Sequence, residues 1–205
     1  MVVFGLCGGS GSGKSTVAAI LSDVGGAVLD ADRIYHELVD APSPCVSALV
    51  AAFGEQILRA DGGLDRRALS RIVFFGDGSE ERRAKLNRIT HSFVKQEIRL
   101  RIAALEQGGA SFAVIDAPLL YESGLDADCD AVIGVLASDR VRIARMTQRD
   151  GITEQEAQRR IAVQLSNGEL CARADVCIEN DADAETLRTA VLALFRQLQQ
   201  AYFMK

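Results

Sequence analysis

The sequence predicts an α/β fold in which one five-stranded parallel sheet is flanked by helices, and three observations lead to this prediction. Five short apolar runs alternate with segments of helical periodicity: 2–7, 27–30, 112–116, 131–136 and 176–179. These runs are apolar almost throughout, as is typical of strands buried on both faces of a parallel sheet. The chain of 205 residues, 48% apolar and 25% charged, is long enough for one large domain with an insertion.

The first elements form a strand, a glycine loop and a helix. Residues 2–7 are apolar, residues 8–13 are glycine and serine only, and the apolar spacing from Lys14 onward suits a helix. The turn at Gly25 and Gly26 leads into the second strand. That strand ends at an acidic step, Asp30-Ala31-Asp32.

A helical insertion is predicted next, because strand signals disappear between residues 33 and 107. Apolar residues recur there at helical spacing, and a longer helix is expected from about Ser92 until Gly108 and Gly109 end it. Strand character returns at 112–116 and 131–136. The insertion therefore occupies 33–107, inside a core of 1–32, 108–137 and 169–205.

Two helices are expected to follow the fourth strand. One begins near Ser138, and the other begins at Thr153, where 153–156 has the pattern of a capping box. Asp150 and Gly151 are the expected hinge between them. A last strand at 176–179 precedes a C-terminal helix, so residues 138–168 are predicted to form a helical lid over the sheet edge.

Charge and cysteine content exclude several classes of protein. Twenty-three basic and 28 acidic residues give a net charge of −5, which argues against non-specific nucleic-acid binding. The sequence has neither the pattern of a signal peptide nor an apolar stretch near the roughly 20 residues that a membrane span needs. The five cysteines are odd in number and scattered, which predicts neither a disulfide framework nor a zinc site and favours a reducing cytoplasm.

The strongest motif is the glycine loop itself. Residues 8–15 match G-x-x-x-x-G-K-[ST] between a predicted strand and a predicted helix, the context that a phosphate-binding loop (P-loop) requires. Backbone N–H groups and the helix N-terminus then surround phosphate oxygens, and Lys14 reaches the β- and γ-phosphates. This predicts a P-loop NTPase fold that binds ATP. The expected ATP-binding residues are Gly9, Gly11, Ser12, Gly13, Lys14, Ser15 and Thr16.

Two oxygen donors are candidate ligands of Mg²⁺. Ser15 offers a hydroxyl at the start of the helix, and Asp116 ends a buried strand, where an acid of the Walker B type is usually found. Asp116 has an alternative structural role as a cap of the turn into Pro118.

Phosphoryl transfer to an alcohol needs a carboxylate that accepts or orients the hydroxyl proton. Asp30 and Asp32 follow the second strand near the predicted phosphate loop, and in an extended chain both would project to the same side. From the residues alone either one could act, and either could instead cap the helix that follows.

Arginines dominate the predicted lid. Seven arginines and no lysine lie between residues 140 and 173, and Arg142, Arg145 and Arg149 recur at i, i+3 and i+7. Such planar donors can close over transferring phosphate, so we expect at least one lid arginine to act in this way, although charged runs are more often solvated faces. Of the two histidines, His91 is expected at the start of the long insertion helix and His36 in solvent.

Taken together, the motifs resemble the dephospho-CoA kinase family along nearly the whole chain. The residues that carry this resemblance are the segments 7–16, 29–32, 64–66, 116–122, 149–150 and 174–175, with His91, Gln164 and Asn180. The P-loop alone indicates only a P-loop kinase or NTPase. Three further motifs narrow the resemblance to this family: the Asp-Ala-Asp step, the Pro-Leu-Leu-Tyr-Glu step, and the Ala-Asp pair that precedes Asn180.

The resemblance implies a reaction and roles for single residues. ATP would phosphorylate the ribose 3′-hydroxyl of dephospho-CoA to give CoA and ADP, with Asp32 facing the acceptor ribose and handling the proton. His91 would help to bind the acceptor, and Arg149 would contact phosphates. Leu119 and Glu122 are also assigned to acceptor binding. The insertion would be the acceptor-binding part, and we expect a monomer or weak homo-oligomer.

The chain departs from the family pattern at two places. Cys7 stands where Thr is often found, which removes a hydroxyl at the edge of the site, and Ser92 stands where the family usually has Pro, which affects the orientation of His91. Two alternatives share the loop: a nucleoside monophosphate kinase, and a nucleotide-sensing protein or GTPase-like switch without turnover. The sequence has no N-K-x-D motif for guanine, which argues against the switch.

Overall fold

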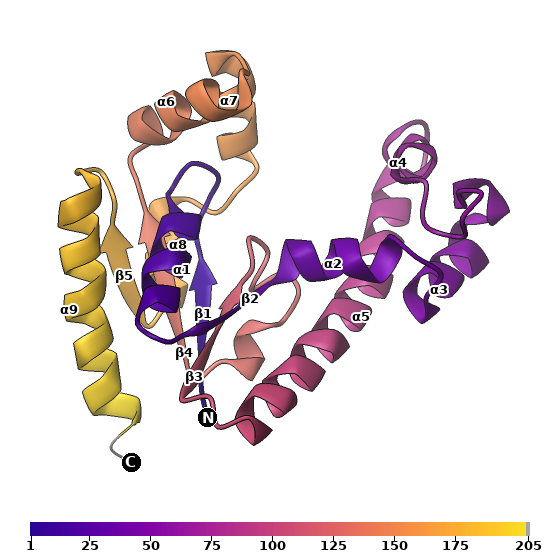
Figure 1. The fold of residues 1–205 in the computed structure, drawn as a ribbon. Coiled ribbons are helices and arrows are strands. Elements are labelled where there is room, and N and C mark those ends of the chain that lie inside the picture. The colour runs from indigo at the N-terminus through magenta and orange to yellow at the C-terminus, as the bar shows by residue number, and fades with distance from the viewer. Residues whose placement is uncertain (204–205) are drawn as a thin grey trace. The chain divides into compact units, whose positions relative to one another are not determined.

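The computed structural model describes residues 1–203 (Figure 1). The strands are β1 Val2–Cys7, β2 Ala27–Asp30, β3 Phe112–Asp116, β4 Ala131–Leu136 and β5 Val176–Glu179. The α-helices are α1 Lys14–Asp23, α2 Ala31–Val39, α3 Pro44–Phe53, α4 Arg66–Phe74, α5 Ser79–Gln107, α6 Asp139–Asp150, α7 Glu154–Ala162, α8 Asn167–Arg173 and α9 Ala184–Tyr202. Two short 3₁₀ turns, Glu55–Ile57 and Asp126–Asp128, complete the elements.

The predicted five-stranded parallel sheet and all five predicted strands are confirmed. The strand order is β2-β3-β1-β4-β5, and β1 runs parallel to both β3 and β4. Because Leu6 is in register with Asp116, the carboxyl end of β3 lies beside the point where β1 enters the glycine loop. The central strands are buried on both faces, which is why they read as continuous apolar runs.

The chain divides into two compact units, which we describe separately. One unit contains Met1–Leu29 and the chain from Ala104 onward, and the other is Asp30–Ala103. The core of the first unit lies where α1 and α9 pack together beside the sheet, and it includes Phe4, Ile133 and Phe195. The second unit is helical and has a core of its own, which includes Leu49 and Val73.

The long helix α5 is longer than the sequence analysis predicts. It begins at Ser79 rather than near Ser92, because Glu80 and Glu81 suit the first turn of a helix and strong helix formers follow them. His91 therefore lies within α5 and not at its start. The predicted end is confirmed: Gly109 has φ 79°, and the amide of Ala110 donates to the Leu105 carbonyl.

The helices after β4 also follow the prediction, with one omission. Ser138 and Thr153 are the N-caps of α6 and α7, and Thr153 forms the expected capping box with Glu156. Helix α8 is not predicted. Its signal was present, because Ser166 and Glu169 form a second capping box, but seven residues are too few for a clear apolar period.

The sequence predicts no disulfide framework, but the structure joins one pair of cysteines. Cys171 on α8 and Cys177 on β5 are joined, with their Cα atoms 6.1 Å apart. The short helix α8 turns the chain back onto β5, and this places the two residues together despite a separation of six positions. Cys7, Cys45 and Cys129 are free. Between residues 1 and 203 no helix is both long enough and apolar enough to cross a membrane.

Candidate active site

The phosphate loop has a backbone conformation that only glycine adopts easily. Gly11 and Gly13 have φ values of 78° and 89°, in the left-handed region. Gly13 is the N-cap of α1, and no side chain caps that helix end. Helix α1 therefore presents unsatisfied N–H groups and the positive end of its dipole directly after the loop, an arrangement that favours anions.

Lys14 and Asp116 meet beside this helix end. Lys14 is the first residue of α1, and its ammonium group donates to the Asp116 carboxylate at the end of β3. Asp116 is only 7% exposed, so the carboxylate of this ion pair is largely shielded from water.

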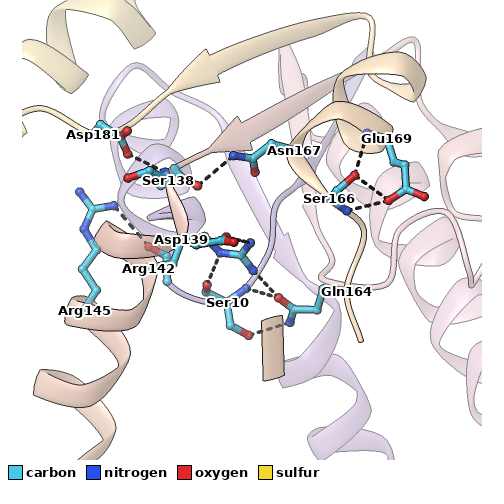
Figure 2. A network of polar contacts seen from close by, with 12 residues as sticks. Ser10, Ser138, Asp139, Arg142, Arg145, Gln164, Ser166, Asn167, Glu169 and Asp181 are labelled. Atoms are coloured by element: carbon cyan, nitrogen blue, oxygen red, sulfur yellow. Dashed lines mark hydrogen bonds and ion pairs between the residues drawn. The ribbon is translucent and has the colours of Figure 1, made fainter. Parts of the chain in front are cut away.

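The segment between β4 and β5 holds the tip of the loop. Arg142 of α6 donates from Nε to the Ser10 carbonyl at 3.0 Å and from Nη2 to Gln164 Oε1 at 2.6 Å. Gln164 in turn accepts from the Ser10 amide at 3.0 Å and donates to the Ser10 hydroxyl at 2.9 Å. Figure 2 shows Ser10 enclosed by these two side chains.

A second pair of side chains holds the next two carbonyls of the loop. Asn180 is buried and donates to the Ser12 carbonyl at 2.7 Å. Arg145 donates to the carbonyl of Gly11 at 3.3 Å and to the Oδ1 atom of Asn180 at 3.3 Å. The loop is thus braced from α6 and from the residue after β5.

The third arginine of the predicted stripe lies elsewhere. Arg149 is on the last turn of α6 with its side chain 65% exposed, and it pairs with Asp150 at 2.7 Å. The neighbouring carboxylate raises the pKa of the Arg149 guanidinium, whereas burial lowers the pKa of the Arg142 guanidinium. The structure therefore brings Arg142 and Arg145, and not Arg149, to the loop.

A small cavity of about 80 Å³ lies beside the first glycines of the loop. Leu119 and Glu122 line it together with Cys7, so two of the residues assigned to acceptor binding are next to the loop. Burial raises the pKa of the Cys7 thiol to about 11, so the thiol is neutral and unreactive at neutral pH. The Tyr121 hydroxyl lies beside it, buried and without a hydrogen-bond partner of ordinary geometry among residues 1–203.

The remaining predicted site residues belong to the helical unit. The expectation that Asp30 and Asp32 project together from an extended chain is wrong, because α2 begins at Ala31. Asp30 is the N-cap of α2 and accepts from the Arg33 amide at 2.9 Å, whereas Asp32 is exposed in the first turn. His91 is half-buried in the middle of α5, and His36 is exposed as expected.

The sequence analysis assigns no role to Tyr121. It places Arg142 in a stripe of arginines that either closes over phosphate or faces solvent, and not in a buried position against the loop. The sequence does contain a signal for Tyr121, because this aromatic residue lies between Leu119 and Glu122, which are both assigned to acceptor binding. The burial of Arg142 had no signal, because an arginine on an amphipathic helix is usually exposed.

The parallel sheet, the glycine loop capping α1 and the Lys14–Asp116 pair define a protein of the P-loop NTPase fold. Solved structures agree on this fold. TT1252 from Thermus thermophilus is 31% identical with a TM-score of 0.79, and 96% of this chain and 97% of that chain are covered. A dephospho-CoA kinase from Campylobacter jejuni, 24% identical, has a TM-score of 0.71 over 97% and 98% of the two chains, and shows the same fold.

The particular family follows from the sequence comparison. The family model described as dephospho-CoA kinase matches residues 2–186, and the chain belongs to that family. A dephospho-CoA kinase of Geobacillus kaustophilus is 40% identical over 96% of both chains. One of Corynebacterium glutamicum is 39% identical over 97% of this chain and 98% of the relative. The resemblance drawn from the motifs is confirmed, and the two alternative functions are not favoured.

Proposed function

We propose that this chain transfers the γ-phosphoryl group of ATP to the ribose 3′-hydroxyl of dephospho-CoA, which yields CoA and ADP. The observation that carries the proposal is the family match over residues 2–186, which begins on β1 and includes the loop that ends at Lys14. Loop amides, the N-terminus of α1 and Lys14 provide positive charge for the phosphates of ATP.

Magnesium fits the donors at this site. Mg²⁺ binds through one or two protein oxygens, together with substrate phosphates and water. Ser15, which follows Lys14 in the chain, and Asp116, which contacts Lys14, have oxygens of this kind. Ser15 and Asp116 would hold the ion directly or through water. When bound, Mg²⁺ neutralises charge on the phosphates.

The chain's own residues would position and deprotonate the reactants. Lys14 would turn from Asp116 to the phosphate oxygens as ATP binds. Asp32 would accept or orient the proton of the acceptor hydroxyl; its exposure in the first turn of α2 leaves the carboxylate accessible, whereas Asp30 is used as a cap. Arg149 would contact phosphates after leaving Asp150. Leu119 and Glu122 would bind the acceptor beside the loop, and His91 would bind it from α5.

Larger parts of the chain take roles in this proposal. Residues 33–107 would bind the acceptor, and residues 138–168 would act as a lid. We propose a monomer or weak homo-oligomer in the cytoplasm that binds neither nucleic acid nor membranes. The net charge of −5 supports the absence of nucleic-acid binding. One disulfide is compatible with a reducing compartment, where such bonds are usually transient or redox-sensing.

The direct test is acceptor-dependent release of ADP from ATP and Mg²⁺. Dephospho-CoA, AMP, CMP and UMP are offered separately and in competition, with a control that has no acceptor. We expect rapid ADP release with dephospho-CoA only, and a product phosphorylated at the ribose 3′ position. Turnover with a nucleoside monophosphate in preference to dephospho-CoA would overturn the proposal.

A further inference from the structure

The guanidinium of Arg142 donates to protein acceptors through each of its three nitrogens. Its side chain is only 3% exposed, and each of its three nitrogens has a partner. Nε donates to the Ser10 carbonyl, Nη2 donates to Gln164, and Nη1 donates to the Asp139 carboxylate at 3.3 Å. The arginine is therefore placed as part of the wall that supports the loop.

The backbone of the loop is fitted closely around this arginine. A Cβ atom at Gly9 would overlap the Arg142 guanidinium and come within 2.8 Å of Gln164 Oε1. A Cβ atom at Gly11 would lie 2.7 Å from the carbonyl oxygen of Arg142 itself. Position 11 therefore needs glycine, because its φ is positive and backbone atoms of Arg142 lie against it, whereas a side chain at Gly9 would displace the ends of Arg142 and Gln164.

Glycine at position 11 also leaves the loop backbone conformationally free. A peptide group is planar and trans, so the Ser10 carbonyl and the Gly11 amide point in opposite directions. Gly11 occupies positive and negative φ with similar ease, and the peptide that joins it to Ser10 can therefore flip at little energy. A flipped peptide would present a carbonyl oxygen, in place of an N–H group, to bound phosphate.

We propose that Arg142, together with Gln164, is a positioning residue for ATP: it holds the Ser10 carbonyl outward and so keeps the Gly11 amide directed into the phosphate site. Gln164 completes the hold, because it binds both the amide and the hydroxyl of Ser10 (Figure 2). All three polar groups of Ser10 are then fixed by the segment between β4 and β5. This inference rests on the proposed ATP-dependent function.

The test uses two variants and a matched control in the full-length protein. Arg142→Met keeps an unbranched apolar stem in place of the aliphatic part of the arginine and removes every donor. Gln164→Leu removes the contacts with the amide and hydroxyl of Ser10 and the acceptor of Arg142 Nη2, but it leaves the bond from Arg142 Nε to the Ser10 carbonyl. Arg188→Met is the control, since Arg188 lies on α9 and makes an exposed ion pair with Asp23.

Two quantities are measured: the hydrogen-exchange rate of the Ser10 amide by NMR without nucleotide, and the affinity for ATP with Mg²⁺ by calorimetry. We expect Arg142→Met to speed exchange at the Ser10 amide, because its acceptor Gln164 loses the contact with Arg142. The same variant should weaken ATP binding about tenfold or more. Gln164→Leu should weaken binding by about three- to tenfold. The KM for dephospho-CoA should change less than twofold, and Arg188→Met should match the wild type.

Two outcomes would overturn the proposal. If ATP binding weakens while exchange without nucleotide is unchanged, Arg142 binds phosphate directly and does not position the loop. If exchange accelerates while ATP affinity is unchanged, the loop does not need this support. Should Arg142→Met fail to fold, Gln164→Leu decides by the same two readouts. Failure of the kinase assay with dephospho-CoA would concern the acceptor only, because neither readout involves the acceptor.

Discussion

The ion pair between Lys14 and Asp116 gives Lys14→Ala two separable consequences. The variant removes one partner of a buried carboxylate, so we expect a loss of roughly 1–3 kcal/mol in the free energy of unfolding. It also removes a charge that stabilises the transferring phosphoryl group, so kcat should fall by about 10²–10³-fold or more. Denaturant unfolding and steady-state turnover on the same samples measure both. A variant with near-normal turnover and a large loss of stability would make Lys14 structural only.

Asp32 and Asp30 form a matched pair for testing the catalytic base. If Asp32 handles the hydroxyl proton, Asp32→Asn should lower kcat by roughly 10²–10⁴-fold with little change in ATP affinity. Asp30→Asn should do much less, because asparagine also caps helices and retains the oxygen that accepts from the Arg33 amide.

The measurements are kcat, ATP affinity and the melting temperature of both variants. A loss below about tenfold for Asp32→Asn would limit its role to orienting the hydroxyl, since phosphoryl transfer has a loose transition state with little deprotonation of the nucleophile. A larger loss for Asp30→Asn would show that the wrong aspartate is assigned.

At the level of single residues the sequence predicted the identity of the loop residues but not the direction of the arginines. Arg142 and Arg149 are seven positions apart and so lie on nearly the same face of α6, as the spacing indicates. Seven positions are also about 10 Å along the helix axis. Arg142 therefore reaches the loop, whereas Arg149 lies two turns further on and pairs with Asp150. Periodicity gives the face of a helix and not its distance from a partner.

Helices α6 and α7 provide a prediction about motion. A lid must open to release product, and α7 is mostly exposed, with Ala157 as its one buried residue. We expect amides of α7 to exchange faster than those of β1 and β4 in the absence of ligands. Hydrogen exchange should slow there when ATP and a non-reactive acceptor analogue bind together.

The internal control is α9, whose exchange should not respond to ligands because it packs on α1 through the apolar core. Equal protection of α7 with and without ligands would contradict a lid between residues 138 and 168. If ATP alone slows the exchange of the α7 amides, nucleotide binding and not acceptor binding closes the lid.

Strands were easier to predict than helices in this chain. Each strand is a short run of mostly apolar residues, and the central strands are buried on both faces, so strand is the natural interpretation of these runs. The start of α5 was not predictable from periodicity, because its first turns carry mostly charged residues and only three of its 29 residues are buried. Tertiary contacts of the helical unit decide where such a helix begins.

For the whole molecule, buried thiols predict how stability depends on pH. Cys7 in one core and Cys45 in the other are buried, and burial raises the pKa of each thiol from 9.0 to about 11. The folded protein thus keeps protons that the unfolded chain releases. The contribution of these thiols is fully present below pH 9 and is lost as the pH rises toward 11.

We expect the free energy of unfolding to fall by about 1 kcal/mol per buried thiol between pH 9 and pH 10. Urea unfolding at several pH values measures this slope. Cys45→Ala should remove the contribution of one thiol, about 1 kcal/mol, from the fall in the free energy of unfolding between pH 9 and pH 10. The variant also lowers stability at neutral pH. A slope unchanged by Cys45→Ala would show that other groups govern alkaline unfolding.

The parallel register of β1 has a consequence for synthesis on the ribosome. Val2 pairs with Phe112 and Phe4 with Ala131, so the first strand to be made has no partner until more than 100 further residues have been added. At typical elongation rates this delay is about 5–20 s. The unit Asp30–Ala103 is complete before Phe112 is made, and its helices can fold while β1 is still unpaired. During that interval an apolar strand destined for the centre of the sheet is exposed, and it is the segment that a chaperone of the nascent chain would protect.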